Sequence, residues 1–368
     1  MPIGYWWTVA FFSWGVVCAL TRWRRLGTVA ALPALLVSEL PFIVGYLLIA
    51  STVLALTEGQ LDSPGGAAGA AVALLALAGL VVVVRRELRA HPALHNAGRP
   101  RRPWGRILRA PFFPGRLDVV RVRGLAYGSG RRRALDVYHR RDRPASAPIL
   151  VHFHGGGFHS GNKAREAKPL IRYLTSRRGF VCVSANYRLQ PRVTLADQVA
   201  DVRSAIAWVR AHAADYCAEP GPLFVTGSSA GANLAIRAVG EGESGIAGLI
   251  CRYGYYGDLT PGGDMPPMLV VHGEKDMLVP PSAVRAFVER VRAVSSRPVS
   301  YAELPGAHHD FDMFESIRSA AVSQAVDQFT AGISACPDVL LREWPHASWR
   351  PGTAPPGRDC GHPAGAVD

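Results

Sequence analysis

Gly227-Ser228-Ser229-Ala230-Gly231 joins two segments of opposite character. Residues 223–226 before it read Leu-Phe-Val-Thr, a short apolar run typical of a buried strand. Residues 232–239 after it are rich in helix formers, and Gly240 follows them. The pattern therefore predicts a strand, a tight turn and a helix in succession. The outer glycines of the turn have no Cβ, so strand and helix can approach closely and the second serine can be exposed on the turn.

His154-Gly155-Gly156-Gly157-Phe158 lies upstream and follows another apolar run, residues 148–153. Three consecutive glycines in a core strand would be entropically costly, so this segment is expected to be a loop. A loop without side chains can turn backbone N–H groups toward a ligand. The N–H groups of Gly156, Gly157 and Ala230 are therefore candidates for an oxyanion hole, which stabilises a developing negative charge on oxygen. The alternative is a flexible surface loop, which the adjoining apolar run disfavours.

Two further apolar runs end in loops that carry acidic and imidazole side chains. Residues 268–273 are followed by Asp276, and residues 299–304 alternate like an edge strand and lead to His308 and His309. A serine, an acid and a histidine in this chain order are typical of ester-cleaving enzymes. In that arrangement Asp276 would orient the ring of the histidine, which accepts the proton of the serine hydroxyl.

The spacing leaves two choices open. His308 and His309 are neighbours, and either satisfies the order along the chain. Asp310 and Asp312 are rival acids, although they are too close in sequence to either histidine to orient its ring easily. Each of these side chains also has an ordinary alternative as a solvated loop residue.

Taken together, the motifs resemble the α/β-hydrolase fold over residues 118–329, and specifically its hormone-sensitive-lipase-like esterase branch. The turn Asn186-Tyr187-Arg188-Leu189 is similar to the Tyr-Arg turn of that branch. In the branch the catalytic histidine is commonly followed, one residue later, by Phe, and His309-Asp310-Phe311 fits this pattern. Ser228 departs from the branch, which often has Asp there.

The resemblance implies an α/β fold with a mostly parallel sheet flanked by helices. It also implies a serine carboxylesterase or lipase, a carboxylic-ester hydrolase of class EC 3.1.1, for which we expect no cofactor and no metal ion. The catalytic residues it assigns are Ser229, Asp276 and His309, and the oxyanion hole is formed by Gly156, Gly157 and Ala230. Two alternatives stay open: a non-catalytic membrane-anchored binding module on a degenerate hydrolase scaffold, and an amidase or lipid deacylase.

Three apolar segments precede this region: Ile3–Leu20, residues 29–56 and residues 67–84. The first contains no charged residue and the second contains one acid, Glu39. Because a membrane span needs about 20 apolar residues, we expect an all-α transmembrane region of about three helices. Bacterial carboxylesterases, to which the resemblance is closest, include members with hydrophobic N-terminal segments.

The second apolar segment is expected to be irregular, since Pro33 and Pro41 interrupt it. A helix starting near Pro41 would leave residues 26–37 as an interfacial or re-entrant piece. Glu39 would then lie at the membrane interface, near a helix start. The short stretch between Ser229 and Asp276 leaves no room for a large lid, so the acyl pocket is either open or covered by the membrane-proximal part.

The positions of the arginines predict the orientation of the apolar segments in the membrane. The first and third apolar segments are each followed by three arginines, whereas residues 57–66 contain no Lys or Arg. The arginines concerned are Arg22, Arg24, Arg25, Arg85, Arg86 and Arg89. The positive-inside rule then predicts a multi-pass membrane protein with its N-terminus outside and its hydrolase domain in the cytoplasm.

The net charge of +13 is concentrated in one region. Residues 85–143 contain 17 arginines and four acidic residues, a difference that equals the whole excess. Next to apolar segments, such a block is expected to attract anionic lipid headgroups. Nucleic-acid binding is disfavoured, because no helix-turn-helix or aromatic-interleaved pattern accompanies the arginines. An ester, and within that class a lipid, is the expected substrate, and the sequence leaves the oligomeric state open.

Four regions are expected: residues 1–90 as the transmembrane helical region, 91–115 as a basic Pro-rich linker, 116–335 as the catalytic domain and 336–368 as a disordered tail. The cysteines show neither CxxC pairs nor zinc-site spacing, which favours free thiols in a reducing compartment. They are Cys18, Cys182, Cys217, Cys251, Cys336 and Cys360.

Overall fold

The computed structural model describes residues 3–22, 28–95, 99–109, 111–112, 115–219, 221, 223–257, 259–260, 262 and 265–335. The expected disordered tail, residues 336–368, lies outside the described residues.

Residues 116–335, the predicted catalytic domain (the catalytic part), are built on a sheet that has eight strands in the described ranges, in the order β1-β2-β4-β3-β5-β6-β7-β8. The strands are β1 (Val119–Ala126), β2 (Ala134–Arg140), β3 (Ile149–Phe153), β4 (Val181–Ala185), β5 (Leu223–Ser228), β6 (Ile246–Arg252), β7 (Met268–Gly273) and β8 (Val299–Leu304). β2 pairs antiparallel with β1 and β4, and all other neighbours are parallel. The predicted α/β fold with a mostly parallel sheet is confirmed.

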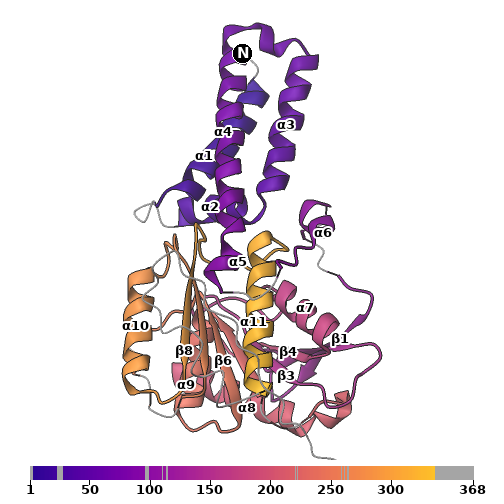
Figure 1. The fold of residues 1–368 in the computed structure, drawn as a ribbon, viewed down its shortest axis with the longest axis vertical. Helices are drawn as coiled ribbons and strands as arrows, with labels where there is room; N and C mark the ends of the chain where they lie inside the picture. Colours follow the sequence, from indigo (N-terminus) through magenta and orange to yellow (C-terminus); the bar gives the residue numbers. More distant parts are fainter. Residues whose placement is uncertain are drawn as a thin grey trace, which may run out of the picture.

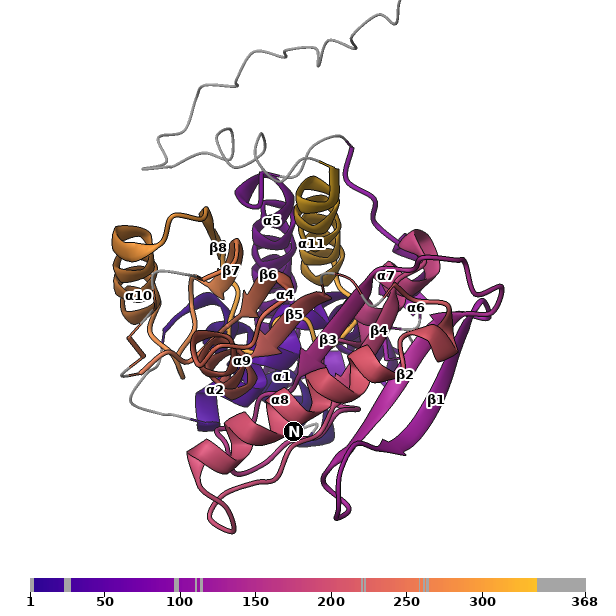
Figure 2. The ribbon, with the colours of Figure 1, turned by 90° about the horizontal axis from the view of Figure 1, so that it is seen from below.

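Helices cover both faces of this sheet, as the view from below shows (Figure 2). One face carries α8 (Leu195–Ala211), α9 (Ala230–Gly240) and α10 (Pro281–Val294); the other carries α7 (Lys168–Arg178) and α11 (Ile317–Ala335). Alternate residues of the central strands serve the two faces: Val225 packs with the first set of helices and Phe224 with the second. Burial on both faces explains why these strands are continuous apolar runs.

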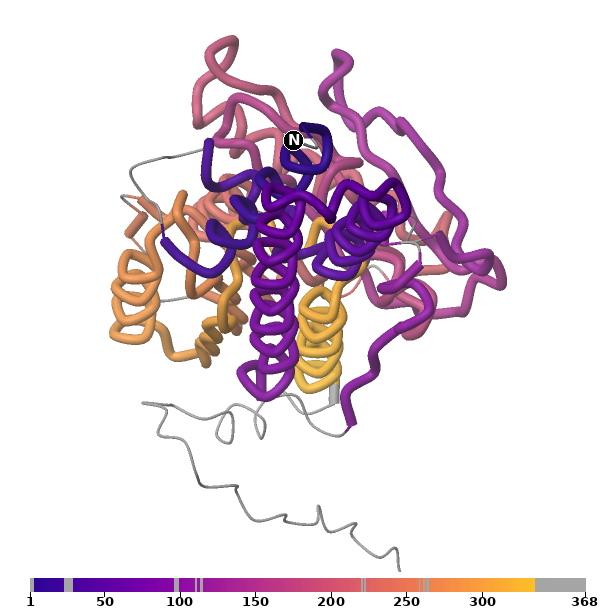
Figure 3. The backbone as a smooth tube through the Cα atoms, turned by 90° about the horizontal axis from the view of Figure 1, so that it is seen from above, coloured from indigo at the N-terminus to yellow at the C-terminus, as the bar shows by residue number. Residues whose placement is uncertain are grey.

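The N-terminal helices form a separate layer that stands on the catalytic part (Figure 1). They are α1 (Ile3–Leu20), α2 (Thr28–Glu39), α3 (Pro41–Thr57) and α4 (Pro64–Leu88), whereas α5 (Ala90–Ala93) continues from α4 into the catalytic part and packs in its core beside α11. Seen from above, they lie over the middle of the catalytic part (Figure 3). Their outer surface carries large exposed apolar side chains, among them Trp7, Phe11, Leu74 and Leu75.

Two of these helices, α1 and the continuous stretch Pro64–Ala93, are long and apolar enough to cross a membrane. Val29–Glu39 and Pro41–Thr57 pass the same test only as a pair, and they are bent by 91°. Up to three spans are therefore possible by length and composition, if the bent pair counts as one. Pro41 occupies the first turn of α3, where its missing N–H is tolerated. Pro33, by contrast, lies inside α2 and does not end it.

Glu39 differs from its expected place. It is the last residue of α2, and it is buried rather than interfacial. Its carboxylate accepts hydrogen bonds from Arg318 of α11 at 2.5 Å and from the hydroxyl of Ser316 at 2.9 Å. Arg318 also lies 3.5 Å from the carboxylate of Glu87 on α4. Two N-terminal helices are thus tied by charge to the helix that packs beside the catalytic sheet.

Candidate active site

The turn after β5 carries Ser229 in a backbone conformation that side chains rarely adopt, with φ 50° and ψ −118°. The close approach of α9 to the sheet requires both flanking glycines. A Cβ on Gly227 would lie 2.4 Å from the backbone nitrogen of Ala232, and one on Gly231 would lie 2.2 Å from the carbonyl oxygen of Phe153. This strained turn lifts the serine hydroxyl out of the strand, and strain of this kind is concentrated at functional sites.

Three of the predicted side chains meet in one hydrogen-bonded row. His309 Nε2 lies 3.0 Å from Ser229 Oγ, and His309 Nδ1 lies 2.7 Å from Asp276 Oδ2. These residues follow β5, β7 and β8, whose parallel alignment brings their carboxyl ends to the same edge of the sheet. The geometry is that of a nucleophile, a base and an orienting acid.

Asp276 is fixed from both sides. Its Oδ1 accepts the backbone N–H groups of Leu278 and Val279 at 2.9 and 2.8 Å. Burial alone would raise the pKa of Asp276, but the charge and hydrogen bond of His309, the charge of His272 and the N–H of Val279 together lower it. Burial likewise opposes a charge on His309, yet the neighbouring Asp276 carboxylate, together with the charges of Asp310 and Glu166, raises the pKa of His309 above its usual value. A carboxylate that stays ionised in this position can stabilise an imidazolium.

The rival side chains have other partners. His308 points to the N-terminal helices, where its Nε2 lies 3.2 Å from the carbonyl oxygen of Ala19, and burial lowers its pKa to about 4. Asp310 pairs with Arg165 at 3.0 Å. Asp312 accepts a hydrogen bond of 2.8 Å from the hydroxyl of Tyr253 and forms an ion pair with the buried Arg252. The geometry thus favours His309 and Asp276 over the alternatives that the spacing left open.

The glycine motif after β3 lies opposite this row. Ser229 and His309 line a cavity with a volume of about 510 Å³, and Gly156, Gly157 and Ala230 line the same cavity. Among the described residues, the backbone N–H groups of these three residues donate to no acceptor. Ala230 is the first residue of α9, where the helix leaves N–H groups without internal partners. Free donors beside the hydroxyl are what an oxyanion hole needs.

A side chain that the sequence analysis did not single out supports the glycine loop. Glu166 is buried, and its Oε2 accepts the N–H of Gly155 at 2.8 Å. The ring of His154 stacks on that of Tyr187 with centroids 4.4 Å apart, and the Tyr187 hydroxyl donates to the His154 carbonyl at 2.8 Å. These contacts join residues distant in sequence, so no local motif indicates the role of Glu166.

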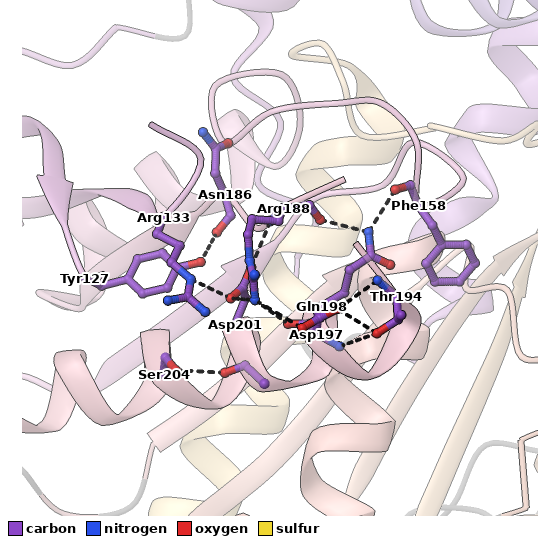
Figure 4. A network of polar contacts seen from close by, with 11 residues as sticks. Tyr127, Arg133, Phe158, Asn186, Arg188, Thr194, Asp197, Gln198, Asp201 and Ser204 are labelled. Atoms are coloured by element: carbon purple, nitrogen blue, oxygen red, sulfur yellow. Dashed lines mark hydrogen bonds and ion pairs between the residues drawn. The ribbon is translucent and has the colours of Figure 1, made fainter. Parts of the chain in front are cut away.

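Asp201 of α8 is a second buried carboxylate that holds the loops beside the glycine motif. Asp201 is buried and receives Arg188 Nε and Arg133 Nε, each at 2.8 Å (Figure 4). One turn earlier, the amide of Gln198 donates to the carbonyl oxygens of Phe158 and Arg188, each at 2.8 Å. Helix α8 therefore holds the end of the glycine motif through Phe158, together with the Tyr-Arg turn.

No group of three or more His, Cys, Asp or Glu side chains that could hold a metal ion occurs within the described ranges. The groups that meet at this edge of the sheet are a serine hydroxyl, an imidazole, a carboxylate and backbone N–H groups.

Comparison with known proteins agrees with this arrangement. The family model BD-FAE matches residues 135–247, which include the glycine motif and the serine turn. The chain is 32% identical over 300 residues to the probable carboxylic ester hydrolase LipM of Mycobacterium tuberculosis, covering 66% of this chain and 68% of LipM. It is 34% identical over 297 residues to the esterase LipQ of the same organism, covering 66% and 70%. The chain belongs to the α/β-hydrolase carboxylic ester hydrolases.

A solved structure supports the fold of this esterase. An inhibited esterase B from Lactobacillus rhamnosis aligns with a TM-score of 0.51 at 18% identity, over 60% of this chain and 88% of that one. At this level of identity the likeness concerns the fold alone. The esterase resembles its relatives over about two thirds of its length.

Proposed function

We propose that this esterase hydrolyses carboxylic esters through an acyl-enzyme on Ser229. His309 accepts the hydroxyl proton while Ser229 Oγ attacks the ester carbonyl carbon. The carbonyl oxygen becomes an oxyanion held by the N–H groups of Gly156, Gly157 and Ala230. Asp276 stabilises the imidazolium formed at this step.

The second half of the reaction follows from the same groups. The oxyanion collapses, the bond to the alcohol oxygen breaks, and His309 gives its proton to the leaving alcohol. A water molecule then gives a proton to His309 and attacks the acyl carbon, and the acid leaves as the proton returns to Ser229 Oγ. Each cycle consumes one ester and one water and releases one alcohol and one acid.

The hydrogen-bonded row from Ser229 through His309 to Asp276, at 3.0 and 2.7 Å, carries this proposal. A fluorophosphonate probe tests it, because such a probe reacts covalently with an activated serine. We expect the purified full-length protein to be labelled once, on the peptide that contains Ser229, as read by mass spectrometry. A protein that stays unlabelled while it is folded would instead indicate a binding module on a degenerate scaffold.

We also propose that the N-terminal helices anchor the enzyme in a membrane. α1, α3 and α4 would cross it, and α2 would lie across the bundle as a re-entrant piece. The exposed apolar side chains of the bundle support this, as does the 91° bend before α3. Residues 1–90 would form the membrane region, residues 91–115 a basic linker attracted to anionic headgroups, and residues 116–335 the catalytic domain. Positive residues flanking α1 and α4 favour a cytoplasmic catalytic domain and an outer N-terminus.

Protease protection measures this orientation. In inside-out vesicles, whose cytoplasmic face is exposed, we expect trypsin to degrade the catalytic domain, and in right-side-out vesicles we expect protection until detergent is added. Antibodies to an epitope tag after residue 368 report the cleavage, and a periplasmic marker protein controls vesicle sidedness. Protection in inside-out vesicles and cleavage in right-side-out ones would place the domain on the outer face.

A further inference from the structure

Helix α2 contributes one wall of a second cavity beside the candidate catalytic histidine. The cavity has a volume of about 170 Å³. Ala31, Leu32 and Leu35 of α2 line one side of it, and Met277 and Leu278 line the other, where it reaches His309. Apart from the histidines and an aspartate at its inner end, its lining is apolar. A cavity of this kind suits a hydrocarbon group better than a polar one.

This cavity adjoins the cleft that holds Ser229. Leu278, His309 and Asp310 line both spaces. A substrate whose carbonyl carbon lies at the serine hydroxyl can therefore extend past the imidazole ring and beneath α2. The two spaces together offer one place for the reacting ester bond and another for an attached chain.

Helix α2 is held in place as a fixed wall. Ala30 and Ala34, on the side of α2 facing the catalytic part, pack with Met277 and with Cys18 of α1. At the end of the helix, Glu39 pairs with Arg318 at 2.5 Å. α2 lies at the junction between the N-terminal helices and the catalytic part (Figure 1). The cavity that α2 lines therefore lies where the proposed membrane region meets the catalytic part.

We propose that α2 and the Met277–Leu278 segment bind one hydrocarbon chain of the ester. The substrates are therefore esters with a medium or long alkyl chain, which enters the cavity from the membrane. This inference rests on the proposed function. The cavity has room for roughly six carbon-sized atoms, taking about 30 Å³ for each, the share of one water molecule in the liquid.

The energetics give a measurable dependence on chain length. Burying one methylene is worth about 0.8 kcal/mol, which corresponds to about fourfold in kcat/KM for each added carbon. We expect kcat/KM of the wild-type enzyme to rise by about this factor up to roughly six carbons and then to level off. Two ester series identify which chain occupies the cavity: p-nitrophenyl esters of increasing acyl length, and acetates of alcohols of increasing length.

Filling the cavity tests the assignment. We expect Ala31→Phe, measured in the full-length enzyme in detergent micelles, to remove most of the gain in kcat/KM with chain length in one of the two series. For the six-carbon ester of that series, kcat/KM falls at least tenfold. For the acetate with the shortest alcohol, kcat/KM changes less than threefold. Val29→Phe is the matched control, because Val29 lies on the same helix, is 66% exposed and does not line the cavity. Leu35→Ala, which enlarges the cavity, is expected to move the optimum to longer chains.

Fluorophosphonate labelling separates this inference from the function on which it rests. Suppose that all variants are labelled on Ser229 and hydrolyse short esters, but that Ala31→Phe and Leu35→Ala keep the wild-type dependence on chain length in both ester series. The proposed α2 site is then wrong, and the esterase mechanism stands. Equal loss of short and long esters in Ala31→Phe, together with an unchanged profile in Leu35→Ala, also overturns it. Absence of labelling in the wild-type enzyme overturns the mechanism itself.

Discussion

Ser229→Ala is expected to lower kcat for p-nitrophenyl acetate on the order of 10⁶-fold, the loss typical of removing the nucleophile from a serine–histidine–acid unit. The expectation follows from the 3.0 Å contact between the serine hydroxyl and His309 Nε2. Without Oγ no acyl-enzyme can form. Only the weak catalysis contributed by binding and by the backbone N–H groups of Gly156, Gly157 and Ala230 remains. Steady-state hydrolysis by the purified full-length protein measures the effect.

The adjacent serine provides a matched control. Ser228 Oγ faces the other way, bonding to Arg252 Nη2 at 2.8 Å and to His152 Nε2 at 3.3 Å. Ser228→Ala therefore leaves a buried guanidinium short of one acceptor, which costs about 1–3 kcal/mol of stability. We expect a lower Tm with kcat within about tenfold of wild type. Turnover at the wild-type rate in Ser229→Ala, or complete loss in a folded Ser228→Ala, would contradict the assignment of the nucleophile.

Asp276→Asn is expected to lower kcat by about 10⁴-fold and to move the acid limb of the pH profile to lower pH. His309 must be unprotonated to act as a base, so activity appears as pH rises through its pKa. In the wild-type enzyme the Asp276 carboxylate raises that pKa above its usual value, against the effect of burial. Removing the carboxylate charge leaves burial less opposed, and the pKa of His309 falls.

A pH series of kcat/KM for both proteins separates the two effects. The plateau reports the lost orientation of the ring, and the midpoint of the acid limb reports the pKa in the free enzyme. A midpoint that stays in place or moves to higher pH would contradict the role of the Asp276 carboxylate in raising the pKa of His309. Asp310→Asn is the comparison: Asp310 pairs with Arg165 and makes no hydrogen bond to the His309 ring, but its charge also raises the pKa of His309. We expect that variant to move the acid limb less than Asp276→Asn does and to keep a plateau close to wild type.

The catalytic edge of the sheet was predictable because its signals are local. The turn around Ser229 needs glycines at fixed positions, and a parallel strand buried on both faces is a continuous apolar run. The order of Ser229, Asp276 and His309 along the chain then follows from the order of the strands. Spacing could not decide between His308 and His309. The two side chains point in different directions, and the packing of His308 against Ala19 determines which of them faces Ser229.

The charged contacts were not predictable, because their partners lie far apart in sequence. Glu39 is expected at an interface by hydropathy alone, yet Arg318, 279 positions later, covers it. Asp201 lies on an amphipathic helix, and only the folded structure brings Arg188 and Arg133 within hydrogen-bond distance of its carboxylate. Likewise, Pro33 and Pro41 both indicate a break, whereas the structure interrupts the helix only at Leu40, which lets α2 turn across the catalytic edge.

The buried guanidinium of Arg318 has a consequence for how this molecule can be divided. Both of its carboxylate partners, Glu39 and Glu87, belong to the first ninety residues. Severing the polypeptide after that region would remove both carboxylates together with the helices that cover the guanidinium, so the buried Arg318 and the apolar surface around it would face water. A water-soluble fragment therefore requires polar substitutions on the surface that the first ninety residues cover, as well as a new terminus.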